Sequence, residues 1–185
     1  MIGYAMCGSF CTMRKSLEIL ASLRTRFDVL PIMSHMTYGT DTRFGLAADF
    51  VEKAERLCGH AVVHSIEDAE PLGPSCPLEA LVICPCTGNT LAKLSRGITD
   101  TPVCMAAKAH LRSDRPLVIA LASNDALSAN LQNIAVLLSR KQVYFTPMHQ
   151  DDPQHKPHSL VADFSLVEPT LEAAMEGRQP RPLFL

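Results

Sequence analysis

The sequence contains no tryptophan, and only 5% of its 185 residues are aromatic. A core with so few rings must be filled by Leu, Val, Ala and Met, a composition that suits an α/β sheet covered by helices. No apolar run approaches the roughly 20 residues that cross a bilayer, and no charged segment precedes the first apolar run. We therefore expect no contact with a membrane and a location in the cytoplasm.

Positive charge is not in excess either. The chain has 17 Lys and Arg against 19 Asp and Glu, a formal net charge of −2. Without a basic stripe, the electrostatic footprint of nucleic-acid binding is missing, so we expect no nucleic-acid partner. A chain of this length buries roughly 70% of its unfolded surface as one unit. We therefore expect a single domain over residues 1–185.

The cysteines do not pair in an obvious way. There are seven, an odd number, mostly inside apolar runs, at positions 7, 11, 58, 76, 84, 86 and 104. This usage fits reduced thiols better than a disulfide framework. Neither of the two close pairs has C-x-x-C spacing, so no metal site is predicted.

Strand and helix patterns alternate from end to end. The predicted strands are 2–7, 29–33, 61–63, 81–84, 117–121 and 142–145; the predicted helices are 12–23, 46–58, 127–138 and 169–175. Short connections between alternating elements imply right-handed crossovers and a parallel sheet with helices on both faces. The expected fold is a three-layer, doubly wound (Rossmann- or flavodoxin-like) α/β sandwich with a mostly parallel sheet.

The polar loops follow the strands of this sheet, at 7–12, 34–44, 85–90, 122–128 and 147–158. Because ligands of such sheets bind at the carboxyl ends of the strands, we expect one shared site. The first loop is not G-x-G-x-x-G, so a nicotinamide dinucleotide site in this chain is not supported. The fifth loop combines His149, Asp151, Asp152 and His155; we favour a solvated or substrate loop there over a metal cluster.

The most informative run is 81–102, where a buried strand leads through a polar turn into a helix near Asn89. Backbone N–H groups at a helix start favour an anion, although an ordinary helix cap has the same pattern. The spacing of Pro85, Thr87, Asn89, Thr90, Lys93, Gly97 and Asp100 resembles the P-[ATS]-[ST]-x-N-[ST]-x-x-K-x-x-x-G-x-x-D run of the flavin-binding cysteine decarboxylase superfamily. Gly8 and Ser9 are similar to that superfamily's first phosphate loop.

This resemblance implies FMN as the cofactor. The residues implied to hold it are Gly8, Ser9, Phe10, Ser34, Pro85, Thr87, Gly88, Asn89 and Thr90. It also implies proton transfer by His64, because histidine titrates near neutral pH. Two alternatives stay open: Ser34 as a plain turn residue, and His64 as a strand-end histidine without a task.

The fourth loop departs from the superfamily, whose P-x-M-N-x-x-M-W pattern holds a substrate carboxylate. Only Asn124 of that pattern is present, which favours acid recognition and puts cysteine decarboxylation in doubt. The runs 7–12, 123–138 and 144–164 resemble one branch of the superfamily, the flavin-type subunits of two-subunit synthases that form a pyridine dicarboxylate during sporulation.

That branch implies a second, different subunit that supplies NADP, a small dicarboxylate substrate, and a homo-oligomer built from trimers. Asn124, Gln150 and Lys156 are the expected substrate-binding residues, with Asn124 also catalytic. Two other functions remain: an FMN-dependent decarboxylase of a cysteine conjugate, and a non-catalytic binding subunit.

Overall fold

One mixed sheet forms the middle layer of the protein. The computed structural model describes residues 1–185. Its strands run in the order β2-β1-β3-β4-β7-β6, with β5 paired to β4. They are β1 (Ile2–Met6), β2 (Val29–Met33), β3 (Leu81–Cys86), β4 (Leu117–Ser123), β5 (Val143–Phe145), β6 (Met148–His149) and β7 (Leu160–Ala162).

The first five strands are parallel, and the chain reverses its winding direction between β1 and β3, which are neighbours. β7 runs antiparallel to the end of β4, and β6 runs antiparallel to β7. The sheet is therefore mostly parallel and doubly wound, which confirms the predicted fold class. Such a reversal opens a crevice at the carboxyl ends of the strands.

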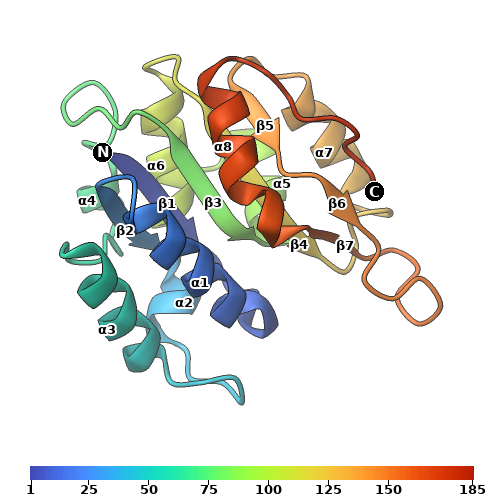
Figure 1. Cartoon of the computed structure of the whole chain (residues 1–185), viewed down its shortest axis with the longest axis horizontal. Helices are drawn as coiled ribbons and strands as arrows, with labels where there is room; N and C mark the ends of the chain where they lie inside the picture. Colours follow the sequence, from blue (N-terminus) through green and yellow to red (C-terminus); the bar gives the residue numbers. More distant parts are fainter.

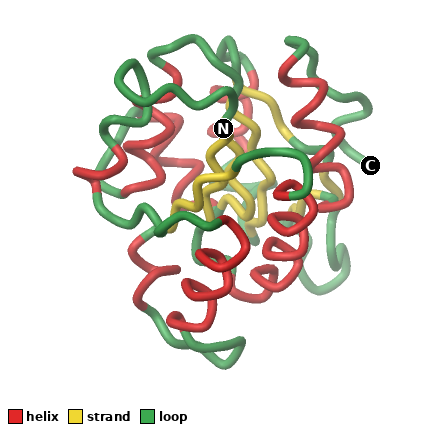
Figure 2. The backbone as a smooth tube through the Cα atoms, turned by 60° about the vertical axis from the view of Figure 1, so that its left-hand side comes forward, coloured by secondary structure: helices red, strands yellow, loops and turns green.

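Helices cover both faces of the sheet, as Figures 1 and 2 show. They are η1 (Phe10–Thr12), α1 (Met13–Arg24), α2 (His35–Gly39), α3 (Ala47–Cys58), α4 (Ile66–Ala69), α5 (Gly88–Arg96), α6 (Pro102–Leu111), α7 (Leu131–Leu138), η2 (Phe164–Leu166) and α8 (Val167–Met175). Buried residues of α1, α3 and α8 pack with Tyr4 of β1 in one core. Those of α4, α5, α6 and α7 pack with Ile83 and Phe145 in the other. None of the helices is long and apolar enough to span a membrane.

The ends of the helices follow local chemistry. Gly59, with φ of 73°, ends α3, and Gly97, with φ of 72°, ends α5; both are left-handed conformations that favour glycine. The Thr87 and Thr101 side chains cap the starts of α5 and α6. These ends fix where α5 begins relative to the sheet.

Some elements differ from the sequence-based expectation. The predicted strand 61–63 is only a single bridge between Val63 and Ile32. The predicted helix 127–138 begins at Leu131, because the residues before it form turns. The sequence patterns also did not predict α2, α4, α6 or the β6–β7 hairpin.

Candidate functional site

A cavity of about 1180 Å³ opens where β1, β3 and β4 end. Four of the five polar loops expected at this edge contribute to it, at 8–12, 87–89, 122–125 and 149–159; the loop 34–44 does not. Lys15 and Glu18 of α1 add to the wall. The volume is of the size that holds a cofactor or a drug-sized ligand.

The first loop makes a tight 3₁₀ turn on one side of the cavity. Thr12 Oγ1 donates hydrogen bonds to the backbone oxygen of Ser9 (2.9 Å) and to Ser9 Oγ (3.0 Å). A Cβ on Gly8 would lie 3.4 Å from both Met36 Cβ and the Phe10 ring, which is ordinary van der Waals contact. The turn thereby fixes the Ser9 hydroxyl at the cavity.

The start of α5 forms the floor. Thr87 Oγ1 accepts a hydrogen bond from the Thr90 N–H (3.3 Å), and Thr90 Oγ1 donates to the sulfur of the buried Cys7 (3.3 Å). Burial raises the pKa of Cys7 to about 12, so this thiol is neutral and structural. Thr90 is buried, whereas the Asn89 side chain is exposed in the cavity.

A carboxylate network holds the fourth loop against this helix start. Ser123 Oγ donates to Asp125 Oδ1 (2.5 Å), and the Asn130 amide donates to both Asp125 oxygens (2.9 Å each). These hydrogen bonds, first that of Ser123, lower the pKa of Asp125 against the opposing effect of burial. Asp125 and the exposed Asn124 both line the cavity.

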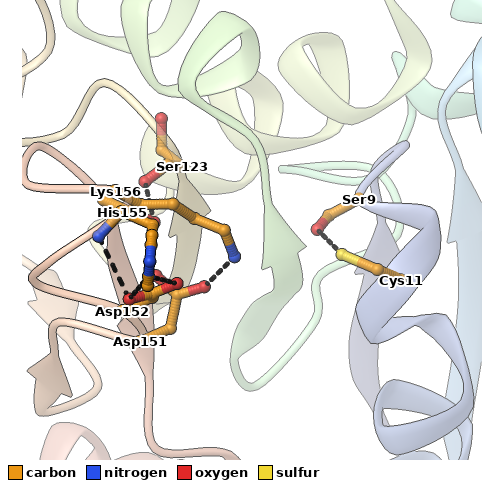
Figure 3. A network of polar contacts seen from close by, with 8 residues as sticks. Ser9, Cys11, Ser123, Asp151, Asp152, His155 and Lys156 are labelled. Atoms are coloured by element: carbon orange, nitrogen blue, oxygen red, sulfur yellow. Dashed lines mark hydrogen bonds and ion pairs between the residues drawn. The ribbon is translucent and has the colours of Figure 1, made fainter.

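The β6–β7 hairpin provides the opposite wall. Figure 3 shows Lys156 reaching from the hairpin toward the side where Ser9 and Cys11 lie, with its ammonium 2.8 Å from Asp151 Oδ2. This pairing lowers the pKa of Asp151 and raises that of Lys156. Lys156 therefore already has a counter-charge.

The rest of the hairpin tip is bonded to itself. His155 Nδ1 lies 3.0 Å from Asp152 Oδ1, and Gln150 Nε2 donates to the Pro157 oxygen (2.9 Å). Gln150 does not line the cavity. No group of three or more His, Cys, Asp or Glu in the structure is arranged to hold a metal ion.

The cavity lining has more acidic than basic side chains. Its lysines are Lys15 and Lys156, and its four carboxylates are those of Glu18, Asp125, Asp151 and Asp163. Without a cationic cluster, a phosphate would depend on backbone N–H groups, hydroxyls and amides. The first N–H groups of a helix have no acceptor inside it, and Gly88 and Asn89 at the start of α5 lie in the lining. Together with the volume of the cavity, this donor set fits an FMN-sized group.

Several residues predicted for the site lie outside the cavity lining. Ser34 is buried, and its Oγ accepts a hydrogen bond from the Thr37 N–H (3.3 Å) as the cap of α2. His64 stacks on Tyr38 with ring centroids 3.9 Å apart, and its Nδ1 lies 3.2 Å from the Val62 oxygen. Phe10, Pro85 and Thr90 are also absent from the lining.

The structure also adds residues to the site that sequence patterns did not single out. Lys15 and Glu18 lie near the start of α1, and a helix start after the first strand faces the ligand edge. Asp163 and Ser165 enter because the hairpin returns to the sheet there. The sequence contained a signal for Lys15 and Glu18 only.

Comparison with known proteins identifies the family. Residues 1–163 match the family model described as Flavoprotein. The chain therefore belongs to the Flavoprotein family.

Within that family, it is similar along its whole length to the B subunit of dipicolinate synthase. It is 42% identical over 185 residues to the B subunit of this synthase from Bacillus subtilis (strain 168), covering 100% of this chain and 92% of the relative. The crystal structure of the corresponding B subunit from Bacillus halodurans C superposes with a TM-score of 0.91 and 39% identity, covering 100% and 95% of the two chains.

A more distant likeness shows the fold alone. The FMN-dependent cysteine decarboxylase SpaF has a TM-score of 0.67 and 23% identity, covering 94% of this chain and 95% of that one.

Proposed function

We propose that this chain is the flavin-type subunit of a dipicolinate synthase, forming pyridine-2,6-dicarboxylate from a dihydrodipicolinate-type precursor together with the NADP-dependent A subunit of that enzyme. The observation that carries the proposal is the 42% identity to the B subunit along the whole chain, and the fourth loop, which departs from the cysteine decarboxylase pattern, lines the cavity. In this proposal the chain is one domain of an oxidoreductase in the cytoplasm of the mother cell of a spore-forming bacterium.

FMN is the proposed cofactor, and the neighbour SpaF is described as FMN-dependent. Flavin, when bound, can take up or release a hydride. Ser9, Asn89 and the N–H groups at the start of α5 are the proposed donors toward it. Gly8 and Gly88 lie in the same lining, and in this proposal Phe10, Pro85, Thr87 and Thr90 hold the two loops in place.

Asn124 and Lys156 are the proposed substrate-binding residues, because their amide and ammonium groups lie in the lining and suit carboxylates. Lys156 would exchange its partner Asp151 for a substrate carboxylate, which makes its contribution smaller than that of an unpaired cation. Gln150 acts in this proposal by shaping the hairpin tip.

We place Ser34 and His64 in a site shared between chains. Both lie outside the cavity lining, and the proposal requires a homo-oligomer of trimers in which a second chain packs on the β2 side of the sheet. A UbiX-like decarboxylase of this fold from Escherichia coli O157:H7, 24% identical, is described as dodecameric and FMN-dependent. In such an assembly His64 would transfer the proton and Ser34 would help hold the cofactor.

Mixing purified subunits tests the proposed function. We expect dipicolinate, followed by its near-ultraviolet absorbance, only when this chain, the A subunit, NADP and the lysine-pathway precursor are combined, because this chain has no dinucleotide loop of its own. If dipicolinate forms at the same rate without this chain, the chain has a binding role only. Release of carbon dioxide from a cysteine conjugate would instead identify a decarboxylase.

Flavin binding is tested separately. Equilibrium titrations should show FMN bound in preference to FAD or NADP, and Ser9→Ala and Asn89→Ala should each weaken FMN binding roughly 2- to 100-fold, by the loss of one hydrogen bond. Ser139→Ala, an exposed residue outside the cavity, is the matched control. If both cavity variants bind FMN with unchanged affinity, Ser9 and Asn89 have only a structural role.

A further inference from the structure

A second, smaller cavity of about 320 Å³ lies at the other end of α5. This helix begins in the first cavity with Gly88 and Asn89, and the two cavities share no lining residue. We call the second one the α6 groove. Its wall consists of α6 and its cap from Cys104 to Arg112, the end of α5 at Leu94 and Gly97, and Arg140, which follows α7. The proposed function gives this groove no role.

The charged side chains of the α6 groove are all cationic. They are Lys108, Arg112 and Arg140, and no Asp or Glu lines the groove. None of the three forms an ion pair in the structure. The groove thus has three positive charges without a counter-charge, whereas the first cavity has more carboxylates than cations.

The segment around the groove is also one-sided in charge. From 91 to 142, seven Lys and Arg stand against three Asp and no Glu, although the whole chain has a net charge of −2. Of these three carboxylates, Asp100 and Asp114 are paired with lysines, and Asp125 lines the first cavity. No carboxylate of this segment is therefore left to neutralise the groove.

The helix ends alone do not explain this cluster. A single cation near the carboxyl end of a helix complements the helix dipole, and Arg140 after α7 has that position. Near the end of α6, however, Lys108 and Arg112 are four residues apart on one face. Like charges at this spacing repel each other and destabilise a helix. An anion bound between them would relieve that repulsion.

Apolar side chains form part of the groove wall. Leu94 and Cys104 are buried, with 6% and 1% of their surface exposed, and Leu111 is partly buried. Cations beside an apolar wall in a concave site attract an anion more strongly than cations on an open surface, because water screens them less. Guanidinium groups also bind a carboxylate or a phosphate through two parallel hydrogen bonds.

We propose that the α6 groove is a binding site for a small multivalent oxyanion, a metabolite that carries two or more phosphate or carboxylate charges. Lys108, Arg112 and Arg140 supply the positive charge, and a volume at the lower end of the range for ligand pockets suits a molecule of that size. This inference does not rest on dipicolinate formation, so each can fail without the other.

Binding calorimetry at low ionic strength tests the proposal with three probes. Pyrophosphate represents the phosphate source, citrate represents the carboxylate source, and acetate carries a single charge. We expect pyrophosphate or citrate to bind saturably with a Kd of about 1 mM or tighter, and acetate to bind roughly 10-fold or more weakly. The tighter of the two multivalent probes identifies the preferred oxyanion.

Substitutions locate the bound anion. Arg112→Gln and Arg140→Gln should each weaken binding of the tighter probe roughly 3-fold or more, and roughly 10-fold or more together, by the loss of charge-assisted hydrogen bonds. Lys108→Gln takes the place of either variant that does not fold. Two controls remove one charge elsewhere: Arg43→Gln at an exposed position outside both linings, and Lys156→Gln in the first cavity. Each control should change the affinity by less than roughly 2-fold.

The inference is overturned if neither pyrophosphate nor citrate binds saturably. It is equally overturned if Arg43→Gln weakens binding as much as Arg112→Gln, since the protein would then respond to net charge alone. A loss of affinity in Lys156→Gln with none in the groove variants would place the anion in the first cavity and also contradict the proposal.

Discussion

Replacing Gly88 by alanine should destabilise the protein, although the same change at most sites near a helix start is neutral or favourable. The added Cβ would overlap Ser123 Oγ and lie 2.7 Å from Asn130 Nδ2. Overpacking of this kind costs about 1–3 kcal/mol, and a lost Ser123–Asp125 hydrogen bond about 0.5–1.5 kcal/mol more. The smaller entropy of the unfolded chain offsets about 0.4–1 kcal/mol.

The net expectation is a loss of about 0.5–4 kcal/mol, or a fall in Tm of about 1–16 °C for a chain of this size. Urea unfolding with the unchanged m-value of a two-state transition would measure it. Gly39→Ala is the matched control, because Gly39 ends the short helix α2 and no heavy atom lies within 4 Å of its added Cβ. The reasoning is refuted if the two variants have the same stability, since the close approach of α5 to the fourth loop would then be easily relieved.

Two further predictions concern the thiols and pH. Cys11 and Cys76 are the exposed cysteines. Iodoacetamide at pH 8 should therefore modify these two in the folded protein and leave the buried Cys7, with its pKa of about 12, unmodified. Mass spectrometry of the intact chain counts the adducts. Burial lowers the pKa of His110 in the folded protein. As the pH falls through about 6.5, this histidine therefore takes up a proton in the unfolded chain before it does so in the folded one. The free energy of unfolding should decrease on acidification as a result. His110→Gln, which can still donate to the Pro116 oxygen, should show a weaker decrease in urea titrations between pH 7 and 5, and an equal decrease would contradict this assignment.

The sequence predicted the central part of the fold well because that part is determined by burial. β3 and β4 are buried on both faces, and their continuous apolar runs identify them without neighbours. The helix α3 combines a strong apolar face with Gly59 at its end. In contrast, β6 and β7 have two and three residues, and only pairing with the end of β4 makes them strands.

The position of the site was predictable because parallel strands deliver their loops to the same edge. The residues that line the site were less predictable than its position. The loop 34–44 follows β2, which lies on the far side of β1 from β3 and β4, so it misses the cavity. The importance of Asp125 depends on Asn130 and Gly88 meeting it in space, and no spacing rule along the chain indicates that contact.

The division of β4 between two partner strands has a consequence for how the protein avoids aggregation. β5 pairs with β4 from Leu117 to Ile119, and β7 takes over the same strand at Ala122 and Ser123. An edge left open over the second part would present unpaired backbone groups next to an exposed cavity, a template on which other chains add strands. Shortening the hairpin to remove its ionic tip should therefore be tolerated only while 160–162 remain in register; deleting those residues as well would produce aggregates rather than a merely inactive protein.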